Sequence, residues 1–88
     1  MAVYVDDAMI PYGRMRMCHL VADTSGELHA MADRIGVARK YAQQSGTPRE
    51  HYDICLAKRE LAIAAGAREC HARFVVGLMH AKRYTEAK

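Results

Sequence analysis

The strongest structural signal in the chain is a helix whose two ends are both marked in the sequence. Thr24 and Glu27 have the T-x-x-E spacing of a capping box, in which the two side chains accept hydrogen bonds from free backbone amides at a helix start. Four apolar residues then recur with the i, i+3, i+4, i+7 spacing of one helix face: Leu28, Met31, Ala32 and Ile35. Gly36 stands where a left-handed C-terminal cap is expected. The pattern therefore predicts a helix between Thr24 and Gly36 with one buried face.

Segments with strand character precede this helix. Ala2–Val5 is short, apolar and rich in residues that favour strands. Pro11 and Gly13 then mark a turn, and residues 14–22 follow with an alternating pattern that becomes apolar, which predicts a second strand. The first part of the chain is therefore expected to run strand, strand, helix.

The second half of the chain repeats this mixture of elements. Residues 37–44 suit either a short strand or one more helical turn. The pattern beyond them predicts a third strand at 51–54, a second helix at Leu56–Ala65, a fourth strand at 67–72 and a last short helix around 74–79. Alternation of strands and helices implies β-α-β crossovers, so we expect the α/β class: a small sheet of about four strands with two to three helices packed on it. Residues 1–81 should form one layered domain, and the basic end at 82–88 should fray.

Composition limits the size of the core. A chain of 88 residues buries only about 64% of its unfolded surface, so it builds one modest core, and self-association into a homo-oligomer is expected to extend that core. With 51% hydrophobic and 26% charged residues, the composition is that of a globular domain rather than of a disordered chain or a membrane protein.

The first residues and the cysteines point to the cytoplasm. The start, MAVYVDDAMIP, lacks the basic and long apolar regions of a signal peptide. Cys18, Cys55 and Cys70 form an odd set without a C-x-x-C pair, which indicates neither a disulfide framework nor a zinc ribbon. They are most simply small buried side chains, with a nucleophilic Cys55 beside His51 as the alternative. We therefore expect a reducing compartment.

The start of the second predicted helix carries two cations. Lys58 and Arg59 lie in about its first turn, where the positive end of the helix dipole disfavours them unless an anion is near. A bound phosphate would resolve this conflict, with His51, Arg39 and Lys40 as further donors, whereas a solvated basic face is the alternative. A net charge of +3 also favours anionic partners. Tyr41 and Tyr52 offer flat surfaces on which a base could stack, with filling of the core as the alternative for Tyr52.

Carboxylates and histidines lie near the predicted strand ends. Asp6 and Asp7 follow the first strand, and alternation sends their side chains to opposite faces, so at most one enters a given pocket; turn caps are the alternative. His19 lies within the second strand, His29 at the flank of the first helix and His51 at the start of the third strand. No two histidines have the tight spacing of a zinc motif, so no metal ligand and no cofactor is predicted.

Three strings in the chain are similar to one known family. They are MAVYVDD with YGR soon after, CHLVADTSGELHAMADRIGVARK and HYDICLAKRELAIAAGA, and together they cover about residues 1–67. These motifs resemble the domain-of-unknown-function 4031 family of small proteins from phages and bacteria, especially actinobacteria. The resemblance implies no established activity, but its pattern emphasises these polar residues: Asp6, Asp7, His19, Asp23, His29, Arg34, Lys40, His51, Asp53, Lys58 and Arg59.

We expect a basic, histidine-bearing pocket that binds a phosphate-bearing small molecule, of the nucleotide, ADP-ribose or cyclic-nucleotide type, without cleaving it. The phage resemblance suggests capture of a host immune signal in the host cytoplasm. The predicted ligand-binding residues are Asp6, Asp7, His19, His29, Lys40, Tyr41, His51, Asp53, Lys58 and Arg59.

Two other classes of function stay open. In a metal-dependent hydrolase or nuclease, Asp6, Asp23 and a histidine would hold an ion that activates water. In a nucleic-acid or protein adaptor, basic side chains from two parts of the chain would make the contacts: Arg14, Arg16, Lys82 and Arg83.

Overall fold

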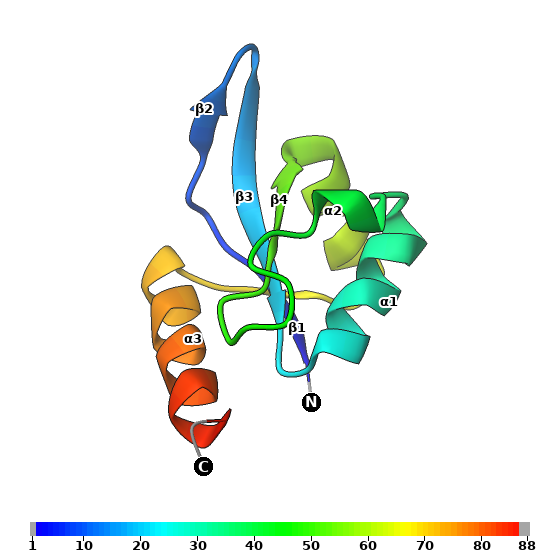
Figure 1. Ribbon diagram of the computed structural model, residues 1–88. Helices are drawn as coiled ribbons and strands as arrows, with labels where there is room; N and C mark the ends of the chain where they lie inside the picture. Colours follow the sequence, from blue (N-terminus) through cyan, green and yellow to red (C-terminus); the bar gives the residue numbers. More distant parts are fainter. Residues whose placement is uncertain (1, 87–88) are drawn as a thin grey trace.

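Five strands and three α-helices make up the chain, in a computed structural model that describes the backbone of residues 2–86 and the side chains of residues 2–82 (Figure 1). The elements follow in this order: β1 (Val3–Val5), β2 (Ile10–Tyr12), β3 (Met15–Ala22), α1 (Ser25–Ile35), the 3-10 helix η1 (Arg39–Tyr41), β4 (Tyr52–Cys55), α2 (Leu56–Ala64), β5 (Arg68–Glu69) and α3 (Ala72–Glu86). The predicted α/β class is confirmed, with five strands in place of about four.

The sheet is built on β3. This strand of eight residues pairs antiparallel with β2 at its start, with β1 at its end and with β4 along its middle. β5 adds to β1 in the parallel direction. Gly13, with φ 60°, lies in the turn between β2 and β3. The sequence pattern placed Pro11 in this turn as well, but Pro11 belongs to the short strand β2 and lies opposite Arg16 of β3.

The β-α-β crossover predicted from β3 through α1 to β4 is wrong. β4 runs antiparallel to β3, with Leu20 opposite Tyr52 and His19 opposite Asp53. The reason is the long segment between α1 and β4, which contains η1. α1 leads the chain back along β3, and this segment then returns it to the end of the sheet where α1 began, so β4 starts there (Figure 1).

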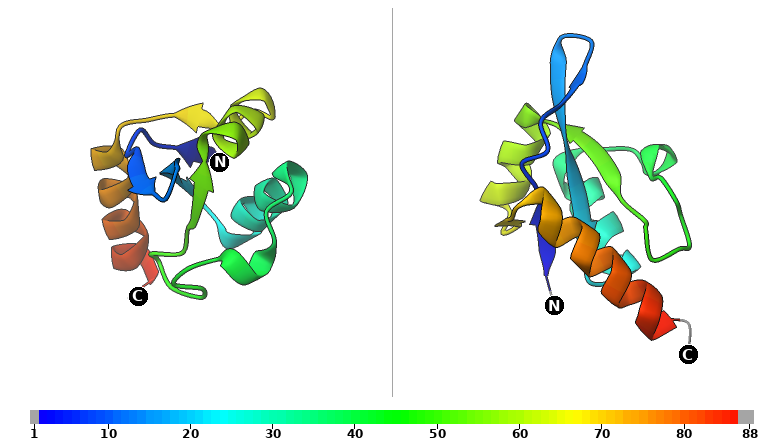
Figure 2. Two further views of the ribbon diagram at one scale, coloured as in Figure 1. Left: turned by 90° about the horizontal axis from the view of Figure 1, so that it is seen from above. Right: turned by 90° about the vertical axis from the view of Figure 1, so that its left-hand side faces the viewer.

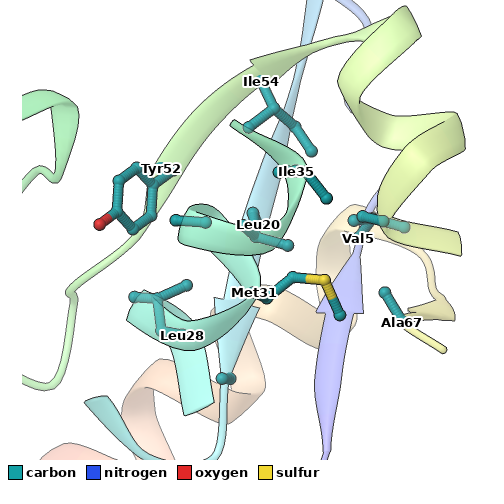
Figure 3. Packing of buried hydrophobic residues seen from close by; sticks show 11 residues of the cluster. Val5, Leu20, Leu28, Met31, Ile35, Tyr52, Ile54 and Ala67 are labelled. Atoms are coloured by element: carbon teal, nitrogen blue, oxygen red, sulfur yellow. The ribbon is translucent and has the colours of Figure 1, made fainter. Parts of the chain in front are cut away.

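Helices cover both faces of the sheet. α1 and α2 lie on one face and α3 lies on the other (Figure 2). The main core lies under α1 and α2, where Leu20, Leu28 and Tyr52 are buried (Figure 3). On the opposite face Phe74 of α3 packs on Tyr4, with 4.8 Å between the ring centroids. This second face carries the polar side chains considered below.

Both ends of α1 lie where the sequence predicts, but the cap differs in one bond, because the Glu27 carboxylate accepts from the Thr24 hydroxyl and not from its backbone amide. The hydroxyl of Thr24 accepts a hydrogen bond from the Glu27 amide (3.2 Å) and donates one to the Glu27 carboxylate (2.8 Å). The four predicted apolar residues of this helix are buried. Gly36 then takes the left-handed conformation, with φ 81°, and its amide donates to the last carbonyls of the helix.

Gly36→Ala is expected to destabilise the fold by about 1–2 kcal/mol, because a side chain is disfavoured in the left-handed region. The added Cβ would also lie 3.2 Å from Lys58 Nζ. Gly26→Ala is the matched control: it lies in α1 with open space around it, and alanine favours a helix. Urea unfolding of both variants measures the difference, and equal midpoints would contradict this role of Gly36.

The last element of the described residues is α3, whose helix continues to Glu86. The range 82–88 was expected to fray, but residues 82–86 belong to this helix. Residues 87–88 and the side chain of Arg83 lie outside the part that the structure describes. Lys82 donates through Nζ to the carbonyl of Ala22, at the end of β3. Within residues 2–86, the helices lack the combination of length and apolar character that a membrane span requires.

Candidate metal centre

A cleft of about 370 Å³ opens between the sheet and α3. Its polar lining comes from the end of β1, from β3 and from the segment that precedes β4: Asp6, His19, Gln44, Arg49 and His51. Its apolar wall comes mainly from α3, through Val75, Val76 and Met79. The cleft therefore joins residues from widely separated parts of the sequence.

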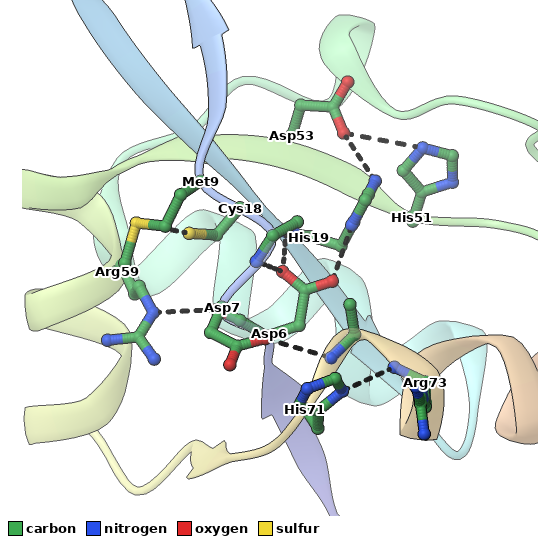
Figure 4. A network of polar contacts seen from close by, with 12 residues as sticks. Asp6, Asp7, Met9, Cys18, His19, His51, Asp53, Arg59, His71 and Arg73 are labelled. Carbon is green, nitrogen blue, oxygen red and sulfur yellow. Dashed lines mark hydrogen bonds and ion pairs between the residues drawn. The ribbon is translucent and has the colours of Figure 1, made fainter.

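Asp6, which is buried, and His19, which is half-buried, form a polar pair in this cleft (Figure 4). The pairing of Val5 with Leu20 brings Asp6, the next residue, beside His19. His19 donates through Nδ1 to Asp6 Oδ2 (2.6 Å) and through its backbone amide to Asp6 Oδ1 (2.8 Å). Although the Asp6 side chain is fully buried, these bonds and one from the Ala8 amide satisfy its two oxygens.

The pair shifts the acidity of both groups. Burial acts to raise the pKa of Asp6, but the hydrogen bonds from His19 and Ala8 outweigh it and hold this pKa below its ordinary value of 3.8. The hydrogen bond to Asp6 raises the pKa of His19 above its ordinary value of 6.5, against the opposing effect of burial. The charged carboxylate of Asp6 is therefore retained at neutral pH and orients the His19 ring.

Asp53 and His51 complete a cluster with His19. The antiparallel pairing of β3 with β4 places Asp53 directly opposite His19, and His51, two residues before Asp53, shares its face. Asp53 Oδ1 lies 3.7 Å from His19 Nε2 and 3.6 Å from His51 Nε2 (Figure 4). One nitrogen or oxygen atom of each side chain lies within 4.8 Å of the other two.

Each side chain of the cluster has a second nitrogen or oxygen atom, which makes a hydrogen bond to a group outside the cluster. His19 Nδ1 donates to Asp6, as described above, and His51 Nδ1 donates to the carbonyl of Arg49 (2.8 Å). Asp53 Oδ2 accepts from Gln43 Nε2 (2.6 Å). Carbonyl and carboxylate oxygens only accept, so each histidine carries a hydrogen on Nδ1, and in the neutral form of the ring Nε2 offers a lone pair. Such outer partners are typical of metal-binding histidines, which they orient and make more basic.

Two imidazole nitrogens and one carboxylate oxygen suit a divalent transition-metal ion such as Zn²⁺. Ligands about 2.1 Å from an ion at tetrahedral angles lie about 3.4 Å from each other. The two distances from Asp53, 3.6 and 3.7 Å, are close to that separation. An ion held by His19, His51 and Asp53 would keep a position open towards the cleft for water or a substrate.

Lys58 and Arg59, which were predicted to bind a phosphate group, make hydrogen bonds to other parts of the protein. Lys58 Nζ donates to the Ile35 carbonyl (2.9 Å), at the negative end of the α1 dipole. Arg59 is buried; its Nε donates to the Asp6 carbonyl (2.9 Å) and its Nη2 to Glu69 (3.3 Å). Groups of the protein therefore compensate these two cations, so their place at a helix start does not by itself require a bound anion.

His29 lies on the core side of the sheet. Its Nδ1 is 2.6 Å from the Tyr52 hydroxyl and its Nε2 is 3.2 Å from Glu50 Oε2. Glu50 is buried and also accepts from the Gly46 amide (3.4 Å); burial acts to raise its pKa, but its hydrogen bonds and the nearby His29 hold that pKa below the ordinary 4.5. This network ties the segment that carries His51 to α1.

The remaining predicted residues lie outside the cluster. Asp7 accepts from the first amide of α3 (3.0 Å), while its neighbour Asp6 lines the cleft, in keeping with the expected divergence of the two side chains. Lys40 and Tyr41 lie in the exposed η1, with 5.2 Å between Nζ and the ring centroid. Asp23 accepts from the amide just before β1 (2.7 Å), at the other end of that strand from Asp6.

Sequence reasoning missed Gln43 and Arg49, and it missed the convergence of the cluster. One signal was present: His51 and Asp53 are alternate residues of a predicted strand, and alternate residues share a face. The spacing rule for metal motifs could not add His19, because that contact depends on the register between two strands with a helix and a long segment between them.

Comparison with models of known protein families identifies the family of this chain. A family model described as protein of unknown function (DUF4031) matches residues 3–82. The match continues beyond residue 67, where the resemblance of the motifs ended, and it includes β5 and most of α3. Searches among curated proteins and among solved structures gave no match. The chain belongs to the DUF4031 family of proteins of unknown function.

Proposed function

We propose that the protein is a metal-dependent hydrolase that cleaves a phosphate ester of a small molecule. The observation that carries this proposal is the cluster of His19, His51 and Asp53, in which each ligand side chain has an outer partner and which borders a cleft. Structural zinc ions are usually closed off by four protein ligands, whereas three ligands beside an open cleft are typical of catalytic ions. The geometry therefore favours a catalytic ion.

The surroundings of the cluster fit a negatively charged organic substrate. Arg49 lines the same cleft as His19 and His51, and a guanidinium group binds two phosphate oxygens at once. Val76 and Met79 of α3 offer apolar contacts in the same cleft. A net charge of +3 adds a general attraction for anions. An organic phosphate satisfies all three features.

The chemistry follows from the arrangement of the groups. A divalent ion held by His19, His51 and Asp53 would lower the pKa of a water molecule and so would supply hydroxide for the attack on phosphorus. The water oxygen forms a bond to phosphorus, the bond from phosphorus to the leaving oxygen breaks, and the leaving oxygen takes up a proton. Arg49 would stabilise the negative charge on the phosphoryl oxygens, while Asp6 keeps His19 Nε2 directed towards the ion.

Hydrolysis by metal-loaded protein tests this proposal. We expect protein loaded with Zn²⁺ or Mn²⁺ to release p-nitrophenol from bis(p-nitrophenyl) phosphate, and EDTA to abolish the release. Arg49→Ala should lower kcat/KM by about 100-fold and leave the metal content unchanged. Arg14→Ala, an exposed cation in the turn between β2 and β3, is the matched control. Absence of turnover of this diester, of nucleotides and of ADP-ribose by the loaded protein would contradict the proposal.

A second outcome would support capture, the function that the sequence led us to expect. In that case a nucleotide, a cyclic nucleotide or an ADP-ribose derivative would stabilise the protein in a thermal-shift screen, by about 2.7 kcal/mol at 100-fold its Kd. The same compound would be recovered unchanged after denaturation of the complex. Sequestration of a host signal by a phage protein remains a prediction, and recovery of intact ligand is the result that would favour it over hydrolysis.

A further inference from the structure

A second hollow, of about 380 Å³, adjoins the metal-binding cluster and takes no part in the chemistry described above. It is lined by residues from the β2–β3 hairpin, η1, the segment after η1 and the start of α2, among them Tyr12, Met15, Met17, Tyr41, Gln43 and Lys58. Asp53 also lines it. Because Gln43 donates to Asp53, this pair belongs both to the hollow and to the cluster.

Two aromatic rings of this hollow are unusually exposed. Tyr12 is 67% exposed and Tyr41 is 59% exposed, and Met15 beside them is 46% exposed. Large apolar side chains gathered around one concavity, rather than scattered singly, are typical of a binding site. Lys40 Nζ lies 5.2 Å from the Tyr41 centroid, a cation–π contact that restrains this ring. The hollow therefore offers flat apolar surface next to the cluster.

The polar groups of the hollow suit the edge of a heterocycle. The ammonium group of Lys58 has three donors and places one of them on the Ile35 carbonyl. Gln43 directs its amide nitrogen to Asp53, and its side-chain oxygen is an acceptor. A nucleobase combines a flat face with donors and acceptors around its edge, and it matches this combination of rings and polar groups.

We propose that this hollow binds the base of a nucleotide whose phosphate lies at the metal-binding cluster. The assignment rests on the proposed hydrolase function for the place of the phosphate, and it names nucleotides as the substrate class. The ribose would pass over the Gln43–Asp53 pair, which separates the two binding regions. Stacking against tyrosine would give affinity with little preference among the bases.

Titration calorimetry of Zn²⁺-loaded protein with adenosine 5′-monophosphate and with ribose 5-phosphate tests the base site. We expect the nucleotide to bind at least about 10-fold more tightly, since ribose 5-phosphate carries a hydroxyl group in place of the base. Tyr41→Ala should remove this advantage without changing the Kd of ribose 5-phosphate, whereas Tyr41→Phe should keep it. Leu61→Ala, a similarly exposed (51%) apolar side chain on α2 outside the hollow, is the matched control.

The possible outcomes separate this inference from the proposed function. Equal Kd values for the two compounds, or no binding of either, would overturn the base site even if one Zn²⁺ still binds. The opposite outcome is also possible: the nucleotide binds, Tyr41→Ala weakens its binding, and the nucleotide stays intact in the presence of Zn²⁺. That result would support the base site and contradict the proposed hydrolase function. Tyr12→Ala provides a second test of the base site, because this exposed ring contributes little to the core.

Discussion

His51→Ala is expected to weaken Zn²⁺ binding by at least about 100-fold while the protein stays folded. The variant removes one of three ligand side chains, whereas loss of an outer partner alone typically costs about 10- to 100-fold in metal affinity. His51 lies on the cleft side of the sheet and packs edge-on against the His19 ring, with 5.4 Å between the centroids, so the main core keeps its packing in the variant. Calorimetric titration of EDTA-treated, dialysed protein with Zn²⁺ measures the affinity.

His80→Ala is the control for this experiment. His80 is an exposed histidine of α3 and lies outside the cluster. Its removal should leave the Kd for Zn²⁺ unchanged. If both variants retained the wild-type affinity, the metal would bind elsewhere and the role assigned to His51 would be wrong.

Asp6→Asn is expected to lower the free energy of unfolding of metal-free protein by about 3 kcal/mol. The variant removes a fully buried charge that accepts from the His19 ring, the His19 amide and the Ala8 amide, and breaking such a buried pair is strongly destabilising. Asp7→Asn is the matched control, because the adjacent carboxylate is exposed and should change stability by less than about 1 kcal/mol. Equal losses in urea unfolding would contradict the importance of the pair.

The same variant gives a defined pH dependence, measured with EDTA present. The pKa of Asp6 is lowered, so its contribution to stability is present above 3.8 and is lost as the pH falls through the lower folded value. The pKa of His19 is raised, so its contribution is complete below 6.5 and is lost as the pH rises through the higher folded value. The stability difference between wild type and Asp6→Asn should therefore be largest between those pH values. A difference that does not vary with pH would contradict the ion pair.

Local sequence signals predicted α1 well, because everything that fixes its ends lies within the helix and its next neighbour. The Thr24 hydroxyl accepts from the Glu27 amide and donates to the Glu27 carboxylate, and Gly36 supplies a backbone conformation that other residues avoid. The same holds for α2, which begins at Leu56 and ends within one residue of the predicted boundary. Elements of two or three residues, such as β2 and β5, owe their existence to pairing with other strands and were harder to place.

The candidate site was less accessible to sequence reasoning, because its contacts are made between distant elements. The unusual position of Lys58 was a genuine signal, but the group that compensates it is the Ile35 carbonyl at the end of another helix. His19 and Asp53 were both named as candidates, yet only the register of β3 with β4 shows that they face each other. The sequence was enough to name the candidate residues, whereas the structure was needed to show which of them lie close together.

Anomalous diffraction from a crystal grown with Zn²⁺ tests the metal centre most directly. The cluster predicts one strong peak per chain, about 2.0–2.2 Å from His19 Nε2, His51 Nε2 and a carboxylate oxygen of Asp53. The peak should vanish in His51→Ala crystals grown in the same way. A wild-type crystal with no peak at this position, or with zinc bound only to other side chains, would contradict the assignment of the metal centre.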